Sequence, residues 1–312
     1  MPLGPLRNPE SRAQRLAGLA RALPALIFLI STLLAFNLVQ TLSLIVRLFS
    51  TRAFRAFNRW AANTWWGWCV ILSERLQGIR IAVSGDPVPV RENAVVFSNH
   101  QQMADITFMM IWARQKDRLG DMKWMVKDII KYVPGVGWGM AFLDCLFVKR
   151  DWAADRASIE RTFARIVRNR VPLWLLSFPE GTRVAPEKVA RSRGYAESHG
   201  LAPLRHLLIP RTKGFVASVR GLGEHATAVY DVTIAYPIGV PTLWQYVRGF
   251  ARLAHLHVRR FPIAGLPAND DDLSSWLQER YREKDRLLEH FYQHGEFPAI
   301  QPGSGEDGAG SR

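Results

Sequence analysis

Cysteine is scarce in this chain, which has only two among its 312 residues. Cys69 and Cys145 each lie in an apolar stretch, and their positions fit neither a disulfide framework nor the ligand spacing of a zinc site. The scarcity therefore argues against a fold held together by disulfides and against a cysteine-based metal centre. We expect two buried free thiols.

Acidic residues are also few, with 27 Asp and Glu against 41 Lys and Arg, which gives a formal net charge of +14. Such a balance suits a polyanionic partner: nucleic acid, an anionic lipid surface or a phosphorylated small molecule. A nucleic-acid-binding protein explains the charge, but no recognised nucleic-acid motif accompanies it. We therefore predict no nucleic-acid partner, and keep this class as the alternative from outside the enzymes.

Charged residues are missing altogether from residues 22–46, ALPALIFLISTLLAFNLVQTLSLIV. A helix of that length can cross the hydrocarbon core of a bilayer, about 30 Å thick. A cleaved signal peptide would have a shorter apolar region and a cleavage site of small residues. We expect a membrane protein, anchored by one helix or by a hairpin bent near Pro24, Asn37 or Gln40. Arginines flank the stretch on both sides, so their distribution does not orient it.

Tryptophans cluster just after this stretch, at Trp60, Trp65, Trp66 and Trp68. This density of indole rings is typical of the headgroup layer of a membrane. Packing of Trp68 and some of the others in the core is an equally good interpretation.

From about residue 78 onward, short apolar runs alternate with amphipathic segments, a pattern that predicts an α/β sheet. Strands are expected at 94–98, 123–127, 145–149, 173–178, 227–236 and 255–261, and helices at 104–116, 152–169, 186–199, 212–222 and 271–293. The fold class is a mixed, largely parallel sheet flanked by helices and preceded by an N-terminal membrane helix or helical hairpin. We divide the chain into a basic segment and anchor (1–59), one α/β domain (60–297) and a disordered tail (298–312) that is too small and polar to fold.

The last predicted helix opens with the acidic run NDDDLSS. Acidic side chains in the first turn complement the positive end of the helix dipole. Capping therefore explains the run better than a calcium or other metal site.

The stretch VVFSNHQQMADITF (95–108) places His100 and Asp105 between a β-rich run and a helical run. Five positions apart on one helix, the two side chains would diverge by about 140°. They meet only if His100 lies in the turn before the helix and Asp105 in its first turn. A carboxylate on one ring nitrogen fixes the tautomer and stabilises the cation formed when the ring takes a proton. The pair therefore suits a general base.

Other interpretations of this corner exist, and the stretch taken alone does not choose between a general base and a capped helix start. Asn and Asp are ordinary capping residues, so a capped helix start explains the pattern without catalysis. Two metal ligands without further His or Cys at metal spacing make a poor metal site, and we predict none. A membrane-bound serine hydrolase would use Ser98 or Ser177, but the nucleophile-elbow spacing is missing.

Cationic turns follow three further apolar runs, each expected to be a strand. LLSFPEGTR (175–183) ends in Glu180, Gly181, Thr182 and Arg183, FVKRDW (147–152) carries Lys149 and Arg150, and LLIPRTKGF (207–215) carries Pro210, Arg211 and Lys213. Open α/β sheets bind ligands at the carboxyl ends of their strands, and an arginine there offers a planar fork for a phosphate. Convergence at one edge would put the base beside phosphate-binding groups.

The order of NHQQMAD, FLDCLFVKR, FPEGTR and LLIPRTKGF resembles the glycerolipid acyltransferase family, over roughly residues 60–297. That family transfers fatty acyl groups from acyl-coenzyme A or acyl carrier protein to lysophosphatidic acid and related acceptors. The segments YREKDRLLEHFYQHGEFP and LIPRTKGF are most similar to the branch of lysocardiolipin-type and long-form lysophosphatidate acyltransferases and their bacterial relatives.

The resemblance implies a role for each block. His100 is the expected base with Asp105 as its partner, Glu180, Gly181 and Arg183 position the acceptor, Lys149 and Arg150 lie in the glycerol phosphate block, and Pro210 lies in the block linked to the acyl donor. Thr182 and Lys213 complete the expected substrate-binding residues. The sequence does not name the group that stabilises the oxyanion, and amides at the start of the helix after His100 are one candidate. Residues 106–112 are expected to pack in the core rather than to line an acyl tunnel.

The expected reaction makes phosphatidic acid from 1-acylglycerol-3-phosphate, with acyl-coenzyme A or acyl carrier protein as co-substrate and without a cofactor. Remodelling of lysocardiolipin or lysophosphatidylglycerol is the alternative. Because activated acyl donors are made in the cytoplasm, we expect a bacterial inner-membrane protein whose active domain faces the cytoplasm.

Overall fold

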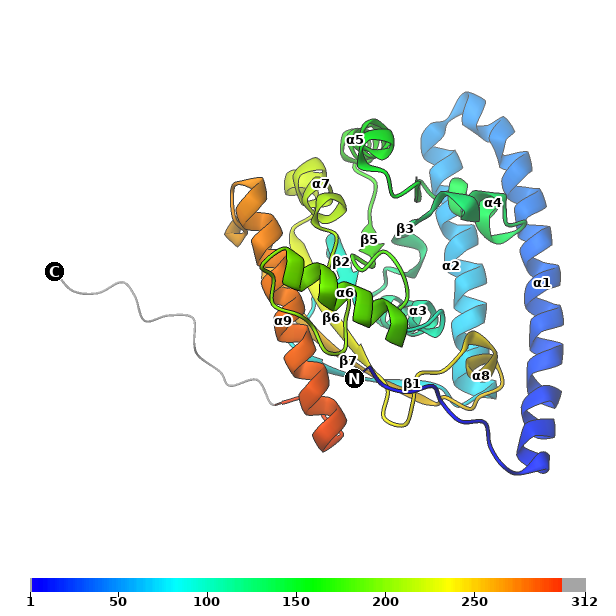
Figure 1. The fold of residues 1–312 in the computed structure, drawn as a ribbon. Coiled ribbons are helices and arrows are strands. Elements are labelled where there is room, and N and C mark those ends of the chain that lie inside the picture. Colours follow the sequence, from blue (N-terminus) through cyan, green and yellow to red (C-terminus); the bar gives the residue numbers. More distant parts are fainter. Residues whose placement is uncertain (1, 299–312) are drawn as a thin grey trace.

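The computed structural model describes residues 2–298, and Figure 1 shows a central sheet with a long helical hairpin along one side. The strands are β1 (Arg80–Gly85), β2 (Ala94–Ser98), β3 (Met122–Lys127), β4 (Leu146–Val148), β5 (Trp174–Ser177), β6 (Ala228–Ala235) and β7 (Leu253–Pro262). They form one sheet in the order β1-β7-β6-β2-β5-β3-β4. Neighbours are parallel except β6 and β7, which are antiparallel. The predicted mixed, largely parallel sheet is confirmed.

Helices connect and cover these strands. They are α1 (Arg12–Phe49), α2 (Thr51–Leu76), α3 (Ala104–Gln115), α4 (Val136–Ala141), α5 (Trp152–Arg168), α6 (Pro186–Ser198), α7 (Thr212–Leu222), α8 (Leu243–Val247) and α9 (Asp270–His294), with short 3₁₀ turns between some of them. Helix α9 begins after Asn269, and three aspartates fill its first turn. The capping interpretation of the acidic run is therefore confirmed.

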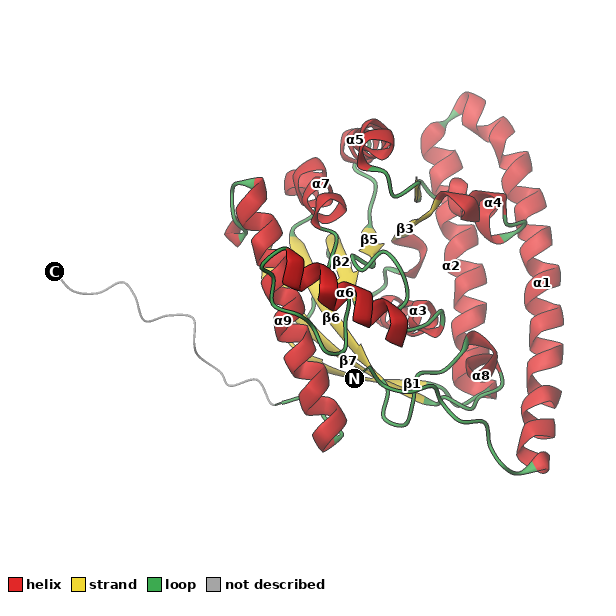
Figure 2. Ribbon diagram, viewed as in Figure 1, coloured by secondary structure: helices red, strands yellow, loops and turns green. Residues whose placement is uncertain are grey.

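The sheet buries apolar side chains on both faces, as a largely parallel sheet requires. In β2, Val96 packs on the side of α2 and α3, in a cluster with Phe108 and Trp112. Val95 and Phe97 belong to the other cluster, with side chains of α5, α7 and α9. Figure 2 shows these three helices and the α1–α2 pair on opposite sides of the strands. Most of residues 106–112 lie in the core, as expected.

The N-terminal hairpin forms between two helices. Helix α1 continues through Pro24, and the chain reverses at Ser50 into α2. The sequence did not decide whether the chain bends within residues 22–46. The bend lies after that stretch, at Ser50. Asn37 and Gln40 are buried, and their side chains lie beside α4, where a Cβ at Gly139 would approach both. These polar groups fix the packing of α1 rather than bending it.

The outer surface of α1 is apolar. Leu23, Ile27, Leu34, Leu38 and Ile45 are all exposed, at a spacing that places them along one side of the helix. An exposed apolar stripe of this length marks a membrane contact. The protein is therefore membrane-associated through its N-terminal apolar helix.

The tryptophans of α2 divide between the two interpretations. The ring of Trp68 packs against Phe28 and Phe36 of α1, with centroid separations of 5.3 and 5.5 Å. Trp60, in contrast, is 55% exposed. Both cysteines are free, with Cys145 buried and Cys69 half-buried, and burial raises the pKa of the Cys145 thiol to about 11.

Two of the strands differ from the sequence prediction, and the short helices α4 and α8 were not predicted. The expected strand at residues 207–209 is wrong, because these residues form a loop that leads into α7. Their backbone amides are satisfied by side chains instead: Leu208 donates to Glu180 and Ile209 to Ser192. Strand β1 was not predicted. It lies at the edge of the sheet beside β7, and none of its residues is fully buried. The predicted tail, 298–312, lies outside the described residues apart from residue 298.

Candidate active site

The side chains of His100 and Asp105 meet at the carboxyl end of β2. His100 lies in the loop after the strand, Asp105 lies in the first turn of α3, and His100 Nδ1 is 2.9 Å from Asp105 Oδ2. The histidine side chain is 12% exposed and the aspartate side chain is fully buried. Phe178 stacks on the imidazole, with the ring centroids 4.1 Å apart and the planes within 17°. The carboxylate and the phenyl ring together fix the imidazole, and within residues 2–298 its Nε2 has no hydrogen-bond partner.

The Asp105 carboxylate is itself held by several donors. Its Oδ2 accepts hydrogen bonds from the backbone amides of Gln101 (2.7 Å) and Gln102 (2.9 Å), and its Oδ1 accepts one from the hydroxyl of Tyr236. Burial, reinforced by Asp105, raises the pKa of Tyr236 well above its ordinary value, so the phenol remains a donor. These three hydrogen bonds fix the orientation of the carboxylate behind the imidazole.

The backbone amides at the start of α3, the candidates for stabilising the oxyanion, have hydrogen-bond acceptors within the protein. The amides of Gln101 and Gln102 donate to Asp105, and the amide of Met103 donates to the side-chain oxygen of Gln102 (3.0 Å). An amide that is already engaged in the protein is not available to a developing negative charge. The amides of Gln101 and Gln102 orient the aspartate.

Glu180 holds two loops together from inside the protein. It is only 3% exposed, and its two oxygens accept hydrogen bonds from the amide of His100 (2.8 Å) and the amide of Leu208 (3.2 Å). Burial raises the pKa of Glu180 to about 8, and the nearby charge of Asp105 acts in the same direction. Through its two hydrogen bonds, the carboxyl group of Glu180 links the loop after β2 to the loop before α7.

Arg183 lies beside the histidine loop. Its Nη1 donates to the side-chain oxygen of Gln102 (2.6 Å), and the amide of the next residue, Val184, donates to the carbonyl of His100 (2.8 Å). The guanidinium is exposed and therefore accessible to a ligand. The Thr182 hydroxyl accepts a hydrogen bond from Lys188 (2.7 Å), which stiffens this turn.

A second cation lies next to the turn after β5. Gly181 has φ +68°, which favours glycine, and a Cβ added there would crowd the Arg211 side chain at 3.2 Å. Arg150, which has φ +68° at the end of β4, has a pKa lowered by burial and by the charge of Arg211. Arg150, Gly181 and Arg211 thus come together at one edge.

The remaining predicted residues are less closely engaged. The backbone amides of Lys149 and Arg150 both donate to Asp155 (2.8 Å each), which shapes the turn, and the Lys149 side chain is exposed. Pro210 is buried in the loop before α7. Lys213 is exposed in the first turn of α7. The sequence predicted four strand ends at the site. Three of them are the ends of β2, β4 and β5, and the fourth is the loop that leads into α7.

Sequence reasoning missed Tyr236, Gln102 and Phe178 as parts of the site. Phe178 and Tyr236 each directly follow a strand, β5 and β6 respectively, at the same edge as His100. The position of an aromatic residue at a strand end was the available signal. Arg211 was noted beside Lys213, and the structure gives it the closer contact with the site.

Comparison with known families identifies the chain. The family described as "Acyltransferase" matches residues 80–237, and that described as "Acyltransferase C-terminus" matches residues 245–308. The chain belongs to the glycerolipid acyltransferase family. The first match spans the sheet from β1 to the end of β6 and so includes His100 and Asp105.

Curated relatives of the acyltransferase fall into two groups by name. It is 32% identical over 257 residues to a probable 1-acyl-sn-glycerol-3-phosphate acyltransferase 5 of Arabidopsis thaliana, covering 82% of this chain and 68% of the relative. It is 36% identical over 244 residues to lysocardiolipin acyltransferase 1 of Danio rerio, covering 75% of this chain and 63% of the relative. The chain thus spans about two thirds of the length of these relatives.

A solved structure shows the same fold. The crystal structure of the 1-acyl-sn-glycerophosphate (LPA) acyltransferase PlsC from Thermotoga maritima matches with a TM-score of 0.51 at 16% identity, covering 89% of this chain and 97% of that one. With the family membership, the protein is a lysophospholipid acyltransferase, which requires an acyl donor and a lysophospholipid acceptor.

Proposed function

We propose that the acyltransferase moves a fatty acyl group from acyl-coenzyme A or acyl carrier protein to the free hydroxyl of 1-acylglycerol-3-phosphate, giving phosphatidic acid. The contact of His100 with Asp105 beside cationic turns is the observation that carries this proposal. It joins a base that can activate a hydroxyl to guanidinium groups that can hold a phosphate.

In the proposed mechanism, His100 Nε2 takes the proton of the acceptor hydroxyl as that oxygen attacks the thioester carbonyl. The negative charge of Asp105 stabilises the imidazolium that forms. When the tetrahedral intermediate collapses, the carbon–sulfur bond breaks, and the imidazolium returns its proton to the departing thiolate. The new ester and the free thiol balance the reaction without an acyl-enzyme.

We assign the surrounding residues by their accessibility. Arg183, exposed beside the histidine loop, holds the acceptor phosphate, with Arg150 and Lys149 on the neighbouring turn. Gly181 and Thr182 shape the turn that presents Arg183. Glu180 acts indirectly, since its carboxylate positions the backbone of His100. Pro210 and Lys213, on the loop and helix that Glu180 links to the site, are assigned to the acyl donor.

The acceptor headgroup is the finer part of the proposal. Lysophosphatidate makes the fewest demands on the site beyond a phosphate, and relatives named for 1-acyl-sn-glycerol-3-phosphate support it. Lysocardiolipin is the second candidate, because relatives with that name are equally similar. We also propose that the active domain faces the cytoplasm of a bacterium at its inner membrane, where activated acyl donors are made.

A competition between acceptors tests this proposal. The purified full chain in mixed micelles receives equal amounts of lysophosphatidate, lysophosphatidylglycerol and lysocardiolipin with one acyl-coenzyme A, and initial rates are read by mass spectrometry. Phosphatidic acid should form fastest, and His100→Ala should form none of the products. Faster acylation of another acceptor would reassign the substrate, and a fully active His100→Ala variant would overturn the mechanism. Repeating the assay with acyl carrier protein identifies the donor.

A further inference from the structure

A separate basic cavity lies at the turn of the helical hairpin. It has a volume of about 530 Å³ and is lined by the end of α1, the start of α2, the end of α4, the segment before β4 and the end of α5. Arg150, in the proposed acceptor site, follows the opposite end of β4. None of the residues proposed for catalysis or substrate binding lines this cavity.

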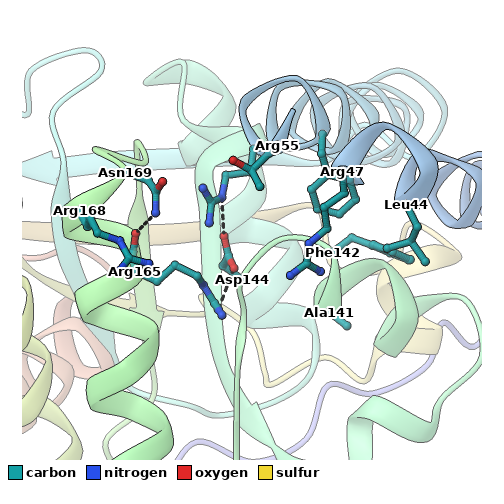
Figure 3. Close-up of a pocket in the computed structure, with 11 residues that line it drawn as sticks. Leu44, Arg47, Arg55, Ala141, Phe142, Asp144, Arg165, Arg168 and Asn169 are labelled. Carbon is teal, nitrogen blue, oxygen red and sulfur yellow. Dashed lines mark hydrogen bonds and ion pairs between the residues drawn. The ribbon is translucent and has the colours of Figure 1, made fainter. Parts of the chain in front are cut away.

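Positive charge dominates the cavity. Its lining includes the guanidinium groups of Arg47, Arg55, Arg165 and Arg168 and a single carboxylate, that of Asp144. Figure 3 shows Arg55 and Arg165 reaching Asp144 from two sides, at 3.3 Å and 2.8 Å. One carboxylate cannot neutralise four guanidinium groups, so the cavity carries an excess of positive charge.

Part of this charge is not neutralised by a carboxylate of the described residues, although Arg47 lies 5.6 Å from the ring centroid of Phe54. Within residues 2–298, Arg47 and Arg168 form no ion pair, and the buried Nε atom of Arg165 has no hydrogen-bond partner. The amino end of α2, at Thr51, adds the positive end of a long helix dipole. The complementary ligand is a phosphate, which accepts several hydrogen bonds from guanidinium groups at once.

The surroundings of the cavity indicate which phosphate it holds. Leu44, on its rim, is 40% exposed and continues the apolar surface of α1, and Leu48 and Phe49 at the turn are 81% and 85% exposed. Apolar side chains that are this exposed fit lipid chains rather than water. A soluble phosphate would use the arginines but not this apolar rim.

We propose that this cavity binds the phosphate headgroup of an anionic membrane phospholipid, with the acyl chains lying against the exposed end of α1. The bound lipid is not the substrate. It joins the membrane hairpin to α5 and β4, and so fixes how the α/β body sits on the bilayer. The proposal does not depend on which acceptor the enzyme acylates.

Two paired variants of the full chain test the site. Arg47→Gln/Arg168→Gln removes the two unpaired cations of the cavity and leaves both ion pairs of Asp144 in place. Arg52→Gln/Arg161→Gln is the matched control, since both arginines are exposed on the same hairpin and on α5 but lie outside the cavity. The two variants have the same net charge, so a general attraction to anionic lipid affects them equally.

The measurement is native mass spectrometry of the detergent-solubilised protein, titrated with phosphatidylglycerol or with phosphatidylcholine. The wild type and the control variant should each retain one phosphatidylglycerol in preference to phosphatidylcholine. The cavity variant should bind phosphatidylglycerol roughly 25-fold more weakly, at about five-fold per arginine. If it does not fold, Arg168→Gln alone, with Arg161→Gln as its control, should show about a five-fold loss.

Three results would overturn the proposal. Equal retention of phosphatidylglycerol by the cavity and control variants would show that the arginines do not form a site. Equal binding of phosphatidylcholine would remove the preference for an anionic headgroup. Displacement of the lipid by coenzyme A or by inorganic phosphate at similar concentrations would assign the cavity to a soluble phosphate compound.

Discussion

The phenol of Tyr236, at the end of β6, donates a hydrogen bond to the carboxylate of Asp105 at the start of α3. The two residues are far apart in the sequence, and both are buried. Through this bond, the strand next to β2 shares in holding the group that faces His100. The histidine is therefore oriented by the tertiary structure and not only by its own loop.

Tyr236→Phe tests that relationship. Without the phenol, the buried carboxylate of Asp105 loses one of its hydrogen-bond donors and holds the imidazole less firmly. We expect kcat to fall by about ten-fold, while the KM of each substrate stays unchanged. Tyr281→Phe is the control, because that buried phenol donates to the carbonyl of Ser98 (3.2 Å) and not to Asp105. An equal loss of kcat in both variants would reduce Tyr236 to a packing role.

His100→Ala should lower kcat by at least about a hundred-fold, the usual contribution of a general base. His100 lies on the surface of the site and is not part of either apolar core, so the fold should persist. Turnover is measured beside membrane association and a thermal melt. Near-normal turnover in a folded variant would exclude His100 as the base.

Arg183→Ala should raise the KM for the acceptor by about ten-fold or more and leave the KM for the donor nearly unchanged, because the proposal assigns this guanidinium to a bidentate contact with the acceptor phosphate. Arg183→Lys should recover only part of the loss, since an ammonium cannot make the bidentate contact. Arg191→Ala, an exposed arginine on α6, serves as the control. A larger effect on the donor KM would show that Arg183 binds the acyl donor and not the acceptor.

Glu180→Gln should change how stability depends on pH. Because burial raises the pKa of the Glu180 carboxyl to about 8, the folded protein binds its proton more tightly than the unfolded chain does. The stability from this proton is fully present below the ordinary pKa of glutamate, and is lost as pH rises toward and through about 8.

The measurement for Glu180→Gln is a set of thermal melts of both proteins between pH 5 and pH 9, flanking that pKa of about 8. Relative to the Gln variant, the wild type should lose stability over this interval. A constant difference in Tm would show that Glu180 does not titrate within it.

Lys284 forms a fully buried ion pair with Asp231, and its ammonium also donates to the carbonyl of Val232 (2.7 Å). Lys284→Met should destabilise the fold by about 3–5 kcal/mol, since it leaves an uncompensated buried carboxylate. Lys284→Met combined with Asp231→Asn should recover much of the loss. Denaturant unfolding in detergent measures both, and additive losses would show that the two groups are not coupled.

Local sequence patterns predicted many of the helices and strands correctly. The apolar runs at 94–98 and 173–178 matched β2 and β5, and the amphipathic segments at 152–169 and 212–222 matched α5 and α7. The loop at 207–209 was missed because Leu207 and Leu208 are apolar and buried like strand residues. Side chains distant in sequence, those of Glu180 and Ser192, satisfy the backbone amides there that a neighbouring strand would otherwise pair.

The sequence by itself determined the membrane helix, the alternating α/β elements and the turn that brings His100 to Asp105, because each depends on residues close together in the chain. Tertiary structure alone decided that Tyr236 supports Asp105, that Arg150 and Arg211 meet near Gly181, and that arginines of α1, α2 and α5 surround one cavity. These contacts join residues from separate elements. Their geometry depends on how the sheet orders its strands and how the hairpin packs against them, which no local periodicity encodes.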